Sequence, residues 1–247
     1  MELSDKVALV TGGAKRVGRA IVLELARGGC DVVVHYRRSE ADAASVASAV
    51  TAMGRRASTV KGDLSNPDDW PRIVQESVNR FGRLDILVNN ASAFLTGSPD
   101  TIEGFNLDEW DLMMRTNLTA PVALSHHAFP HLAAHRAGKI INLCDISADR
   151  PWANHLAYCA SKAALVAVTR GLAKALAPAV QVNGVAPGIA EFPDSYSQEL
   201  REQLIAKVPL RRAGTPEDIA RAVRFLVESG DYITGQIIPV DGGRSVV

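Results

Sequence analysis

Short apolar runs alternate with helical patterns along nearly the whole chain, and this alternation is the strongest constraint on the fold. The apolar runs lie at 6–11, 31–36, 57–61, 84–88, 139–143, 180–185 and 235–240. Helical patterns occupy 40–53, 67–81, 158–177, 198–207 and 216–228, and a longer helical region from residue 107 is expected to be broken or bent near Pro121 and Pro130. Buried parallel strands have such runs, and their alternation with helices is typical of doubly wound α/β proteins. We predict one domain over residues 1–247, with helices on both faces of a parallel sheet.

The composition excludes several classes of partner. The chain has 247 residues, of which 47% are hydrophobic, and its 27 Lys and Arg balance its 27 Asp and Glu. This balance gives no reason to expect nucleic acid or an anionic membrane surface as a partner. No apolar run has membrane-spanning length, and the first residues lack a signal-peptide pattern. The three cysteines have no Cys-x-x-Cys spacing, so we expect reduced thiols and a cytoplasmic protein.

A glycine-rich turn follows the first predicted strand and precedes a helical pattern. It contains Gly12, Gly13 and Gly18. Glycines allow the backbone to approach a ligand closely, and a helix N-terminus offers free N–H groups to phosphate. The turn therefore predicts a Rossmann-type dinucleotide site, while a tight turn that only requires glycine is the alternative.

The residues that end the second predicted strand select the cofactor. NAD enzymes usually carry a carboxylate about 20 residues after the glycines, where it holds the ribose hydroxyls. This segment instead reads His35, Tyr36, Arg37, Arg38 and Ser39. Arginines and a hydroxyl suit a 2′-phosphate, so we predict NADPH/NADP. A basic surface loop is the alternative, and the nearby Glu40 keeps NAD open.

Polar residues gather where the predicted strands end. Thr11, Arg37, Asp63, Asn90 and Ser92 each lie at or just after the carboxyl end of a strand. Ligands of open parallel sheets bind at that edge. We therefore expect these residues to lie around one site.

Tyr158 and Lys162 stand four apart in a predicted helix, so their side chains share one face. An ammonium near a phenol favours the phenolate, and we expect Lys162 to lower the pKa of Tyr158. The pair could then exchange a proton with a reacting group. Alone, this spacing also fits a solvated helix face.

Two other patterns are interpreted as structural. His127, His131 and His135 recur every four residues, but no His-Glu-x-x-His motif is present and Pro130 is expected to disturb the helix. We predict a polar helix face there and no metal site. Cys159 adjoins Tyr158 but has no evident base, so we do not expect a nucleophile.

The motifs taken together resemble the short-chain dehydrogenase/reductase family. The resemblance covers nearly the whole chain and rests on Thr11-Gly12 to Gly18, Asp63-Leu64, Asn89-Asn90-Ala91, Asn117, Tyr158-x-x-x-Lys162, Pro187-Gly188 and Asp241-Gly242-Gly243. Two positions depart from the family pattern. Arg16 occupies the place of a glycine, and Asp145 occupies the place of the catalytic serine, thirteen residues before Tyr158. Ser147 is two residues out of register and is not expected to substitute.

Both departures are similar to the pteridine reductases. Further similarity lies in His35-Tyr36-x-Arg38-Ser39, Asn90-Ala91-Ser92-x-Phe94 and Lys207-Val208-Pro209-Leu210. The resemblance implies NADPH-dependent reduction of pterins, including biopterin, dihydropterin or dihydrofolate. A physical argument agrees with it, because an ionised aspartate opposes a developing alkoxide and better suits a substrate nitrogen that must be protonated.

The resemblance also implies roles for individual residues. Tyr158 and Asp145 would deliver the proton, Lys162 would hold the nicotinamide ribose, and Asn117 would anchor Lys162 through water. Phe94 would stack on the pterin, Ser92 and Arg16 would bind its edge or the cofactor phosphates, and Trp152 would line the pocket. The remaining cofactor contacts would be Thr11, Gly12, Val17, Gly18, Asp63, Leu64, Asn90, Ala91, Pro187, Gly188 and Ile189.

The sequence also leaves two alternative functions open. A ketone reductase, for example of ketoacyl thioesters, and an NADP-binding regulator without catalysis are the alternative functions. The resemblance implies a homotetramer, and the segment Ile189–Ser197 is expected to close over the substrate.

Overall fold

Seven parallel strands form one twisted sheet at the centre of the molecule. The computed structural model describes residues 1–94, 102–135, 137–192 and 196–247. The strand order is β3-β2-β1-β4-β5-β6-β7, which confirms the predicted doubly wound Rossmann-type sheet. The strands are β1 (Val7–Val10), β2 (Asp31–Tyr36), β3 (Ala57–Lys61), β4 (Ile86–Asn89), β5 (Gly138–Leu143), β6 (Val180–Pro187) and β7 (Ile237–Val240).

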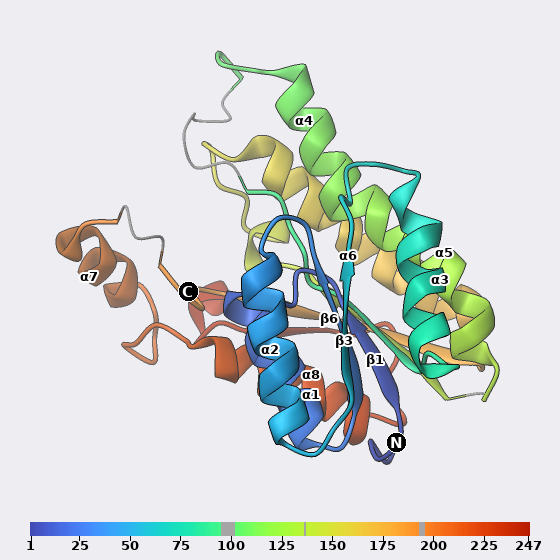
Figure 1. Ribbon diagram of the computed structural model, residues 1–247. Coiled ribbons are helices and arrows are strands. Elements are labelled where there is room, and N and C mark those ends of the chain that lie inside the picture. Colours follow the sequence, from blue (N-terminus) through green and yellow to red (C-terminus); the bar gives the residue numbers. More distant parts are fainter. Residues whose placement is uncertain (95–101, 136, 193–195) are drawn as a thin grey trace.

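Helices cover both faces of the sheet (Figure 1). One face carries α1 (Arg16–Arg27), α2 (Glu40–Ala52) and α8 (Pro216–Glu228). The other face carries α3 (Asp69–Phe81), α4 (Leu107–Met114), α5 (Ala120–Ala133) and α6 (Leu156–Leu176). The short α7 (Gln198–Ala206) projects from the body of the molecule, and none of its residues is buried.

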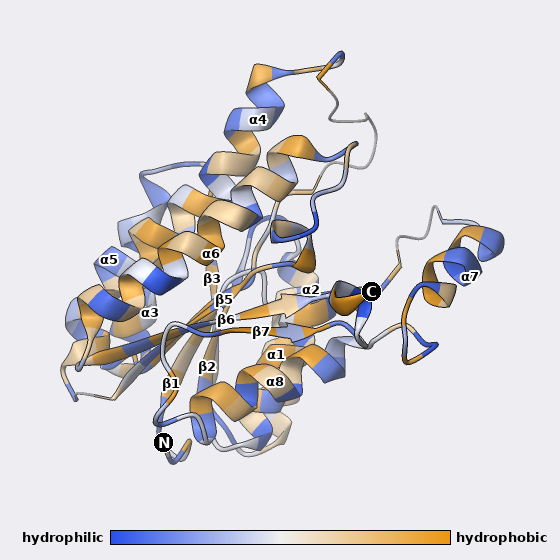
Figure 2. Cartoon of the chain, turned by 180° about the vertical axis from the view of Figure 1, so that it is seen from behind, coloured by the Kyte–Doolittle hydropathy of each residue, from blue (hydrophilic) through white to orange (hydrophobic). Residues whose placement is uncertain are grey.

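The central strands are buried on both faces, and most of their residues are apolar. Every residue of β1, β2, β4 and β5 is buried, and Figure 2 shows the strands coloured mainly as hydrophobic. In β1, Ala8 lies between Val32 of β2 and Ile86 of β4, so the core extends across the sheet. Among the described helices, none is both long and apolar enough to cross a membrane.

The helical region from Leu107 differs from the expectation. A π-helical segment, Arg115–Thr119, joins α4 to α5, and Pro121 stands in the first turn of α5. Proline lacks an N–H and is tolerated in a first turn. Pro130 lies inside α5, which continues to Ala133, so the helix does not break at Pro130. Pro67 also precedes its helix, which begins at Asp69.

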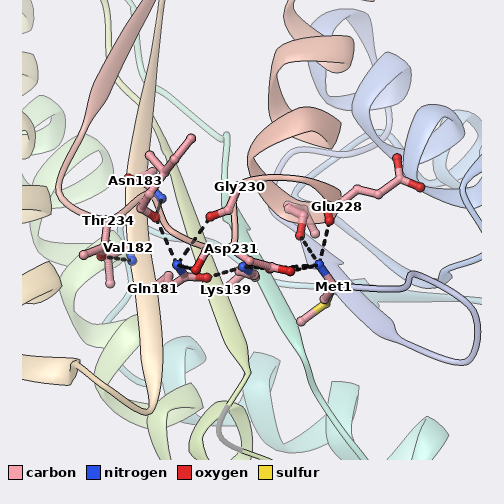
Figure 3. A network of polar contacts seen from close by, with 11 residues as sticks. Met1, Lys139, Gln181, Val182, Asn183, Glu228, Gly230, Asp231 and Thr234 are labelled. Atoms are coloured by element: carbon pink, nitrogen blue, oxygen red, sulfur yellow. Dashed lines mark hydrogen bonds and ion pairs between the residues drawn. The ribbon is translucent and has the colours of Figure 1, made fainter.

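A buried lysine ties the amino end of the sheet to the turn after α8 (Figure 3). Lys139 is the second residue of β5, and its side chain is 2% exposed. Its Nζ donates to Gln181 Oε1 and, over 2.8 Å, to Asp231 Oδ1. The N-terminal ammonium of Met1 donates to the same carboxylate over 2.9 Å. This network joins the N-terminus, β5, β6 and the turn after α8 at the edge of the sheet opposite to the carboxyl ends of the strands.

Candidate active site

Two neighbouring cavities open at the carboxyl edge of the sheet. The glycine-turn cavity has a volume of about 630 Å³, and the outer cavity has a volume of about 640 Å³. The residues that line both are Arg16, Phe94, Asp145, Tyr158, Gly188 and Glu191. The two cavities therefore meet at the predicted catalytic residues.

The glycine turn brings the backbone close to itself beneath the first cavity. Gly12 adopts a φ of +61°, and a Cβ added at Gly18 would lie 2.1 Å from the Gly12 carbonyl oxygen. Both positions therefore require glycine. Lys15 precedes α1 without a side-chain capping bond, so the first N–H groups of this twelve-residue helix remain available to a ligand. This cradle and the cavity above it fit a dinucleotide phosphate.

Thr11 and Asn90 brace the turn from two strands. Thr11 Oγ1 donates to the Val88 carbonyl over 3.2 Å and accepts from the N–H groups of Asn90 and Ala91 over 2.9 and 3.0 Å. The amide of Asn90 donates to the Thr11 carbonyl over 2.7 Å. Asn90 therefore holds the turn, and its expected position beside the adenine ribose stays a prediction.

His35 connects the turn to the second and third strands. Its Nδ1 accepts from Gly12 N–H over 3.1 Å, and its Nε2 faces the Gly62 carbonyl at 3.2 Å. The first partner is a donor and the second an acceptor, so the neutral Nε2–H tautomer satisfies both. Burial lowers the pKa of His35 from 6.5 to about 4. The imidazole thus supports the cofactor site as a neutral bridge.

Only some of the residues predicted to recognise a 2′-phosphate line the glycine-turn cavity. Arg37 lines the glycine-turn cavity and approaches Asp63 at 3.9 Å. Leu64 also lines this cavity. Arg38 is exposed and Tyr36 is buried, and neither lines the cavity, nor does Ser39. Arg37 is therefore the arginine best placed for a phosphate at this end of the site.

Tyr158 and Asp145 form the hydrogen bond at the junction of the two cavities. Tyr158 OH donates to Asp145 Oδ2 over 2.9 Å, and Asp145 Oδ1 accepts from Ser147 N–H over 2.8 Å. Asp145 thus caps the short turn Ile146–Ala148 and also accepts a hydrogen bond from the phenol. Burial and the Asp145 carboxylate raise the pKa of Tyr158 well above its usual value. The phenol therefore stays protonated as a donor.

The expected lowering of the Tyr158 pKa by Lys162 was wrong in this structure. Lys162 Nζ donates to the Leu143 carbonyl over 2.7 Å and lies 5.7 Å from the centre of the Tyr158 ring. Burial lowers the pKa of Lys162 itself. Desolvation and the Asp145 carboxylate instead raise the pKa of Tyr158. The carbonyl that holds Lys162 had no signal in the sequence.

Asn117 lies buried in the π-helical segment and fixes the end of β4. Its Oδ1 accepts from Ala93 N–H over 2.7 Å and from Ser92 Oγ over 3.1 Å, and its Nδ2 donates to Ser161 Oγ over 3.1 Å. Within the described ranges no hydrogen bond joins the side chains of Asn117 and Lys162, so the water-mediated anchor stays a prediction. Ser92 itself is exposed beside the first cavity.

Aromatic rings surround Tyr158 on the outer side. Phe94 stacks on His155 at 4.9 Å and meets Tyr158 edge-on at 4.9 Å. Trp152 lies nearly parallel to Tyr158 with ring centres 6.1 Å apart. Sequence reasoning missed His155, although it stands three residues before Tyr158. One face of Phe94 is therefore already occupied, and only its other face can receive a ligand.

Arg16 reaches from the turn to the segment that follows β6. It has a φ of +52°, a left-handed conformation that favours glycine, at the position where the resembled family has one. Arg16 Nε donates to Glu191 Oε2 over 2.6 Å. Pro187 and Gly188 border the first cavity, while Ile189 lines the outer one. Glu191 was missed because nothing local in the sequence pairs it with Arg16, 175 residues away.

Other candidate residues lie apart from this junction. Ser147 and Cys159 are buried and line neither cavity. His127 and His131 line a groove between α3 and α5 with Arg72 and Glu76. In the described ranges, no three His, Cys, Asp or Glu side chains are grouped to hold a metal ion.

Comparison with known proteins places this geometry among related reductases. A family model described as Enoyl-(Acyl carrier protein) reductase matches residues 12–245. A 3-oxoacyl-[acyl-carrier-protein] reductase FabG of Staphylococcus aureus is 36% identical over 242 residues, 96% of this chain and 97% of the relative.

Solved structures are similar over almost the whole chain. A Serratia marcescens short-chain dehydrogenase/reductase mutant superposes with a TM-score of 0.92 at 36% identity, covering 99% of this chain and 100% of that one. FolM alternative dihydrofolate reductase 1 from Brucella canis, complexed with NADP, has a TM-score of 0.93 at 33% identity, covering 100% and 96%.

Proposed function

Because the chain belongs to the short-chain dehydrogenase/reductase family, we propose that it is an NADPH-dependent reductase of pterins. The observation that carries this proposal is the hydrogen bond from Tyr158 OH to Asp145 Oδ2, 2.9 Å long. A carboxylate here stands where the family usually places a serine. The chain is an NADP-dependent oxidoreductase of this family whichever substrate it reduces.

The residues around the glycine-turn cavity fit the cofactor. The turn and the N-terminus of α1 would hold the phosphates, Arg37 would face the 2′-phosphate, and buried Lys162 would hold the nicotinamide ribose. NADPH, when bound, supplies a hydride to the substrate carbon. The chain supplies alignment and the proton.

Tyr158 would donate that proton to the ring nitrogen next to the reduced carbon. Its raised pKa keeps the phenol protonated, and Asp145 holds the hydroxyl in one orientation. An ionised Asp145 would oppose the negative oxygen that forms when a ketone is reduced. Reduction of a C=N bond creates no such oxygen, because the nitrogen accepts the proton.

The outer cavity offers surfaces for a flat heterocycle. Phe94 and Trp152 border it next to Tyr158, where Phe94 meets the phenol ring edge-on and Trp152 lies nearly parallel to it. Aromatic faces stack favourably on planar rings. Ser92 and Arg16 lie at the glycine-turn cavity, where their polar groups could meet the donors and acceptors of a pterin edge.

A ketoacyl thioester reductase is the second candidate function. Its support is the name of the relative from Staphylococcus aureus, a 3-oxoacyl-[acyl-carrier-protein] reductase. FolM, whose name contains dihydrofolate reductase, is a comparably similar solved structure and supports the pterin candidate. The two candidates differ at position 145, because ketone reduction forms a negative oxygen that an ionised Asp145 would oppose, whereas C=N reduction forms none.

Exchange at position 145 tests the proposal. Asp145→Ser restores the family pattern, and Asp145→Asn keeps the shape of the side chain without its charge. We expect both variants to lose at least about tenfold in kcat for dihydrobiopterin, since proton delivery contributes on the order of 10²–10⁴ in rate. NADPH binding should be unchanged. Asp145→Ser with an undiminished pterin rate would contradict the proposed role.

Assembly and closure complete the proposal. We propose a cytoplasmic homotetramer, as the family resemblance implies, and its mass is measurable by light scattering. The segment Ile189–Ser197, of which residues 193–195 lie outside the described ranges, would close over the substrate. Its contact through Glu191 with Arg16 connects this segment to the glycine turn.

A further inference from the structure

The outer cavity carries two cationic side chains that have no acidic partner among the described residues. Lys207 follows α7, and Arg244 begins the 3₁₀ turn Arg244–Val246; both line this cavity. Within the described ranges, neither forms an ion pair within 4.0 Å of a carboxylate. Lys207 is exposed and Arg244 is half-buried, so both are accessible to a ligand.

The acids that line the same cavity are already engaged. Asp145 accepts hydrogen bonds from Tyr158 OH and Ser147 N–H, and Glu191 pairs with Arg16 at 2.6 Å. These contacts lie at the junction with the glycine-turn cavity. With both acids engaged in this way, Lys207 and Arg244 give the described lining of the outer cavity surplus positive charge.

An aromatic wall belongs to the same cavity. Its lining includes Trp152, Phe192 and Tyr196, and the rings of Phe192 and Tyr196 lie 6.3 Å apart. A volume of about 640 Å³ suits a drug-sized ligand, which is larger than a bicyclic ring alone. The lining of the cavity thus combines a proton donor, aromatic surfaces and two cationic side chains.

We infer that Lys207 and Arg244 bind a carboxylate at the distal end of the substrate. The inference rests on the proposed function and narrows it to pterins with an aryl and carboxylate tail, as in dihydrofolate, over pterins with a short neutral side chain. The phosphate groups of a thioester substrate are anionic like the carboxylate of a pterin tail. The test therefore also includes a thioester that carries phosphate.

The test compares matched substrates on Lys207→Met, Arg244→Met and the double variant. Methionine keeps an unbranched side chain without the charge. The substrates are dihydrofolate, dihydropteroate and dihydrobiopterin, which carry two, one and no carboxylates. Each single variant should raise KM for dihydrofolate by about fivefold and leave KM for dihydrobiopterin unchanged, because a partly exposed charge contact contributes modestly.

Arg80→Met is the control, since Arg80 is an exposed residue of α3 that lines neither cavity. The wild-type preference for dihydrofolate should also weaken as salt is raised. A double variant that keeps the ratio of the two KM values within twofold of wild type would overturn the inference.

Binding to the NADP⁺-loaded protein separates this inference from the proposed function. If no pterin is reduced, the proposed function fails, while the ratio of dissociation constants for dihydrofolate and dihydrobiopterin still tests the cationic pair. Acetoacetyl-CoA and the neutral acetoacetyl-N-acetylcysteamine form the thioester arm. A charge preference confined to these thioesters and lost in the double variant would overturn the carboxylate tail in favour of a phosphate.

Discussion

Tyr158 donates a hydrogen bond to Asp145 across 2.9 Å, although the two residues belong to different elements. Asp145 follows β5 and caps the short turn Ile146–Ala148, while Tyr158 lies in the first turn of α6. The carboxylate and burial raise the pKa of the phenol, so the hydroxyl keeps its proton. This pairing distinguishes the site from one that polarises a ketone oxygen through serine.

Removing the phenol hydroxyl should remove proton delivery. We predict that Tyr158→Phe lowers kcat for pterin reduction by about 10²–10⁴ and leaves the dissociation constant of NADPH nearly unchanged. Because the Tyr158 pKa is raised, the wild-type kcat should not fall through loss of its proton between pH 7 and 9. A variant that retains a tenth of the wild-type rate would assign the proton to another group.

Arg37 should select NADPH over NADH. It lines the glycine-turn cavity, whereas Arg38 does not, so Arg37→Ala should raise KM for NADPH by about tenfold, as expected for a charge-assisted phosphate contact. KM for NADH should stay the same, because NADH lacks the 2′-phosphate. Arg38→Ala serves as the matched variant with a smaller expected effect. Equal changes in both KM values would show that Arg37 acts only on the fold.

Acid should destabilise the protein through His35. Its folded pKa of about 4 lies below the ordinary 6.5, so the unfolded chain binds more protons between these values. The stabilisation is complete above pH 6.5 and is lost as the pH falls towards 4, by about 3 kcal/mol at 1.36 kcal/mol per unit. Urea unfolding from pH 7.5 to 4.5 measures this loss.

The control is His35→Asn, which can still accept from Gly12 N–H but does not titrate in this range. This variant should be less stable than wild type at neutral pH and should lose less stability on acidification. Parallel stability curves for the two proteins would place the acid sensitivity elsewhere.

The sequence predicted the sheet and the junction well because these depend on local patterns. Apolar runs define buried strands, and the carboxyl ends of parallel strands share one edge, where Thr11, Asp145 and Asn90 lie. The contacts of Glu191, His155 and the Leu143 carbonyl with their partners depend on tertiary packing. The direction in which the Tyr158 pKa shifts also depends on packing, because the desolvation of the phenol is set by neighbours distant in sequence.

Removing the partner of the buried Lys139 should destabilise the protein more than removing the charge of Lys139 itself. Its side chain is 2% exposed, while its partner Asp231 is 67% exposed. Asp231→Ala leaves a buried ammonium with Gln181 as its remaining side-chain partner, and we expect a loss of about 3 kcal/mol. Lys139→Met leaves a carboxylate that water can solvate, so about 1 kcal/mol is expected. Urea unfolding at pH 7 measures both, and a larger loss for Lys139→Met would contradict the argument.

The most direct test is the initial rate of NADPH oxidation by the purified protein with biopterin, dihydrobiopterin, dihydrofolate and acetoacetyl-CoA, with NADH as the parallel cofactor. The proposed function predicts turnover of a pterin with NADPH, little with NADH, and a lower kcat/KM for acetoacetyl-CoA. Turnover of acetoacetyl-CoA with no pterin reduced would contradict it and assign the site to thioester reduction.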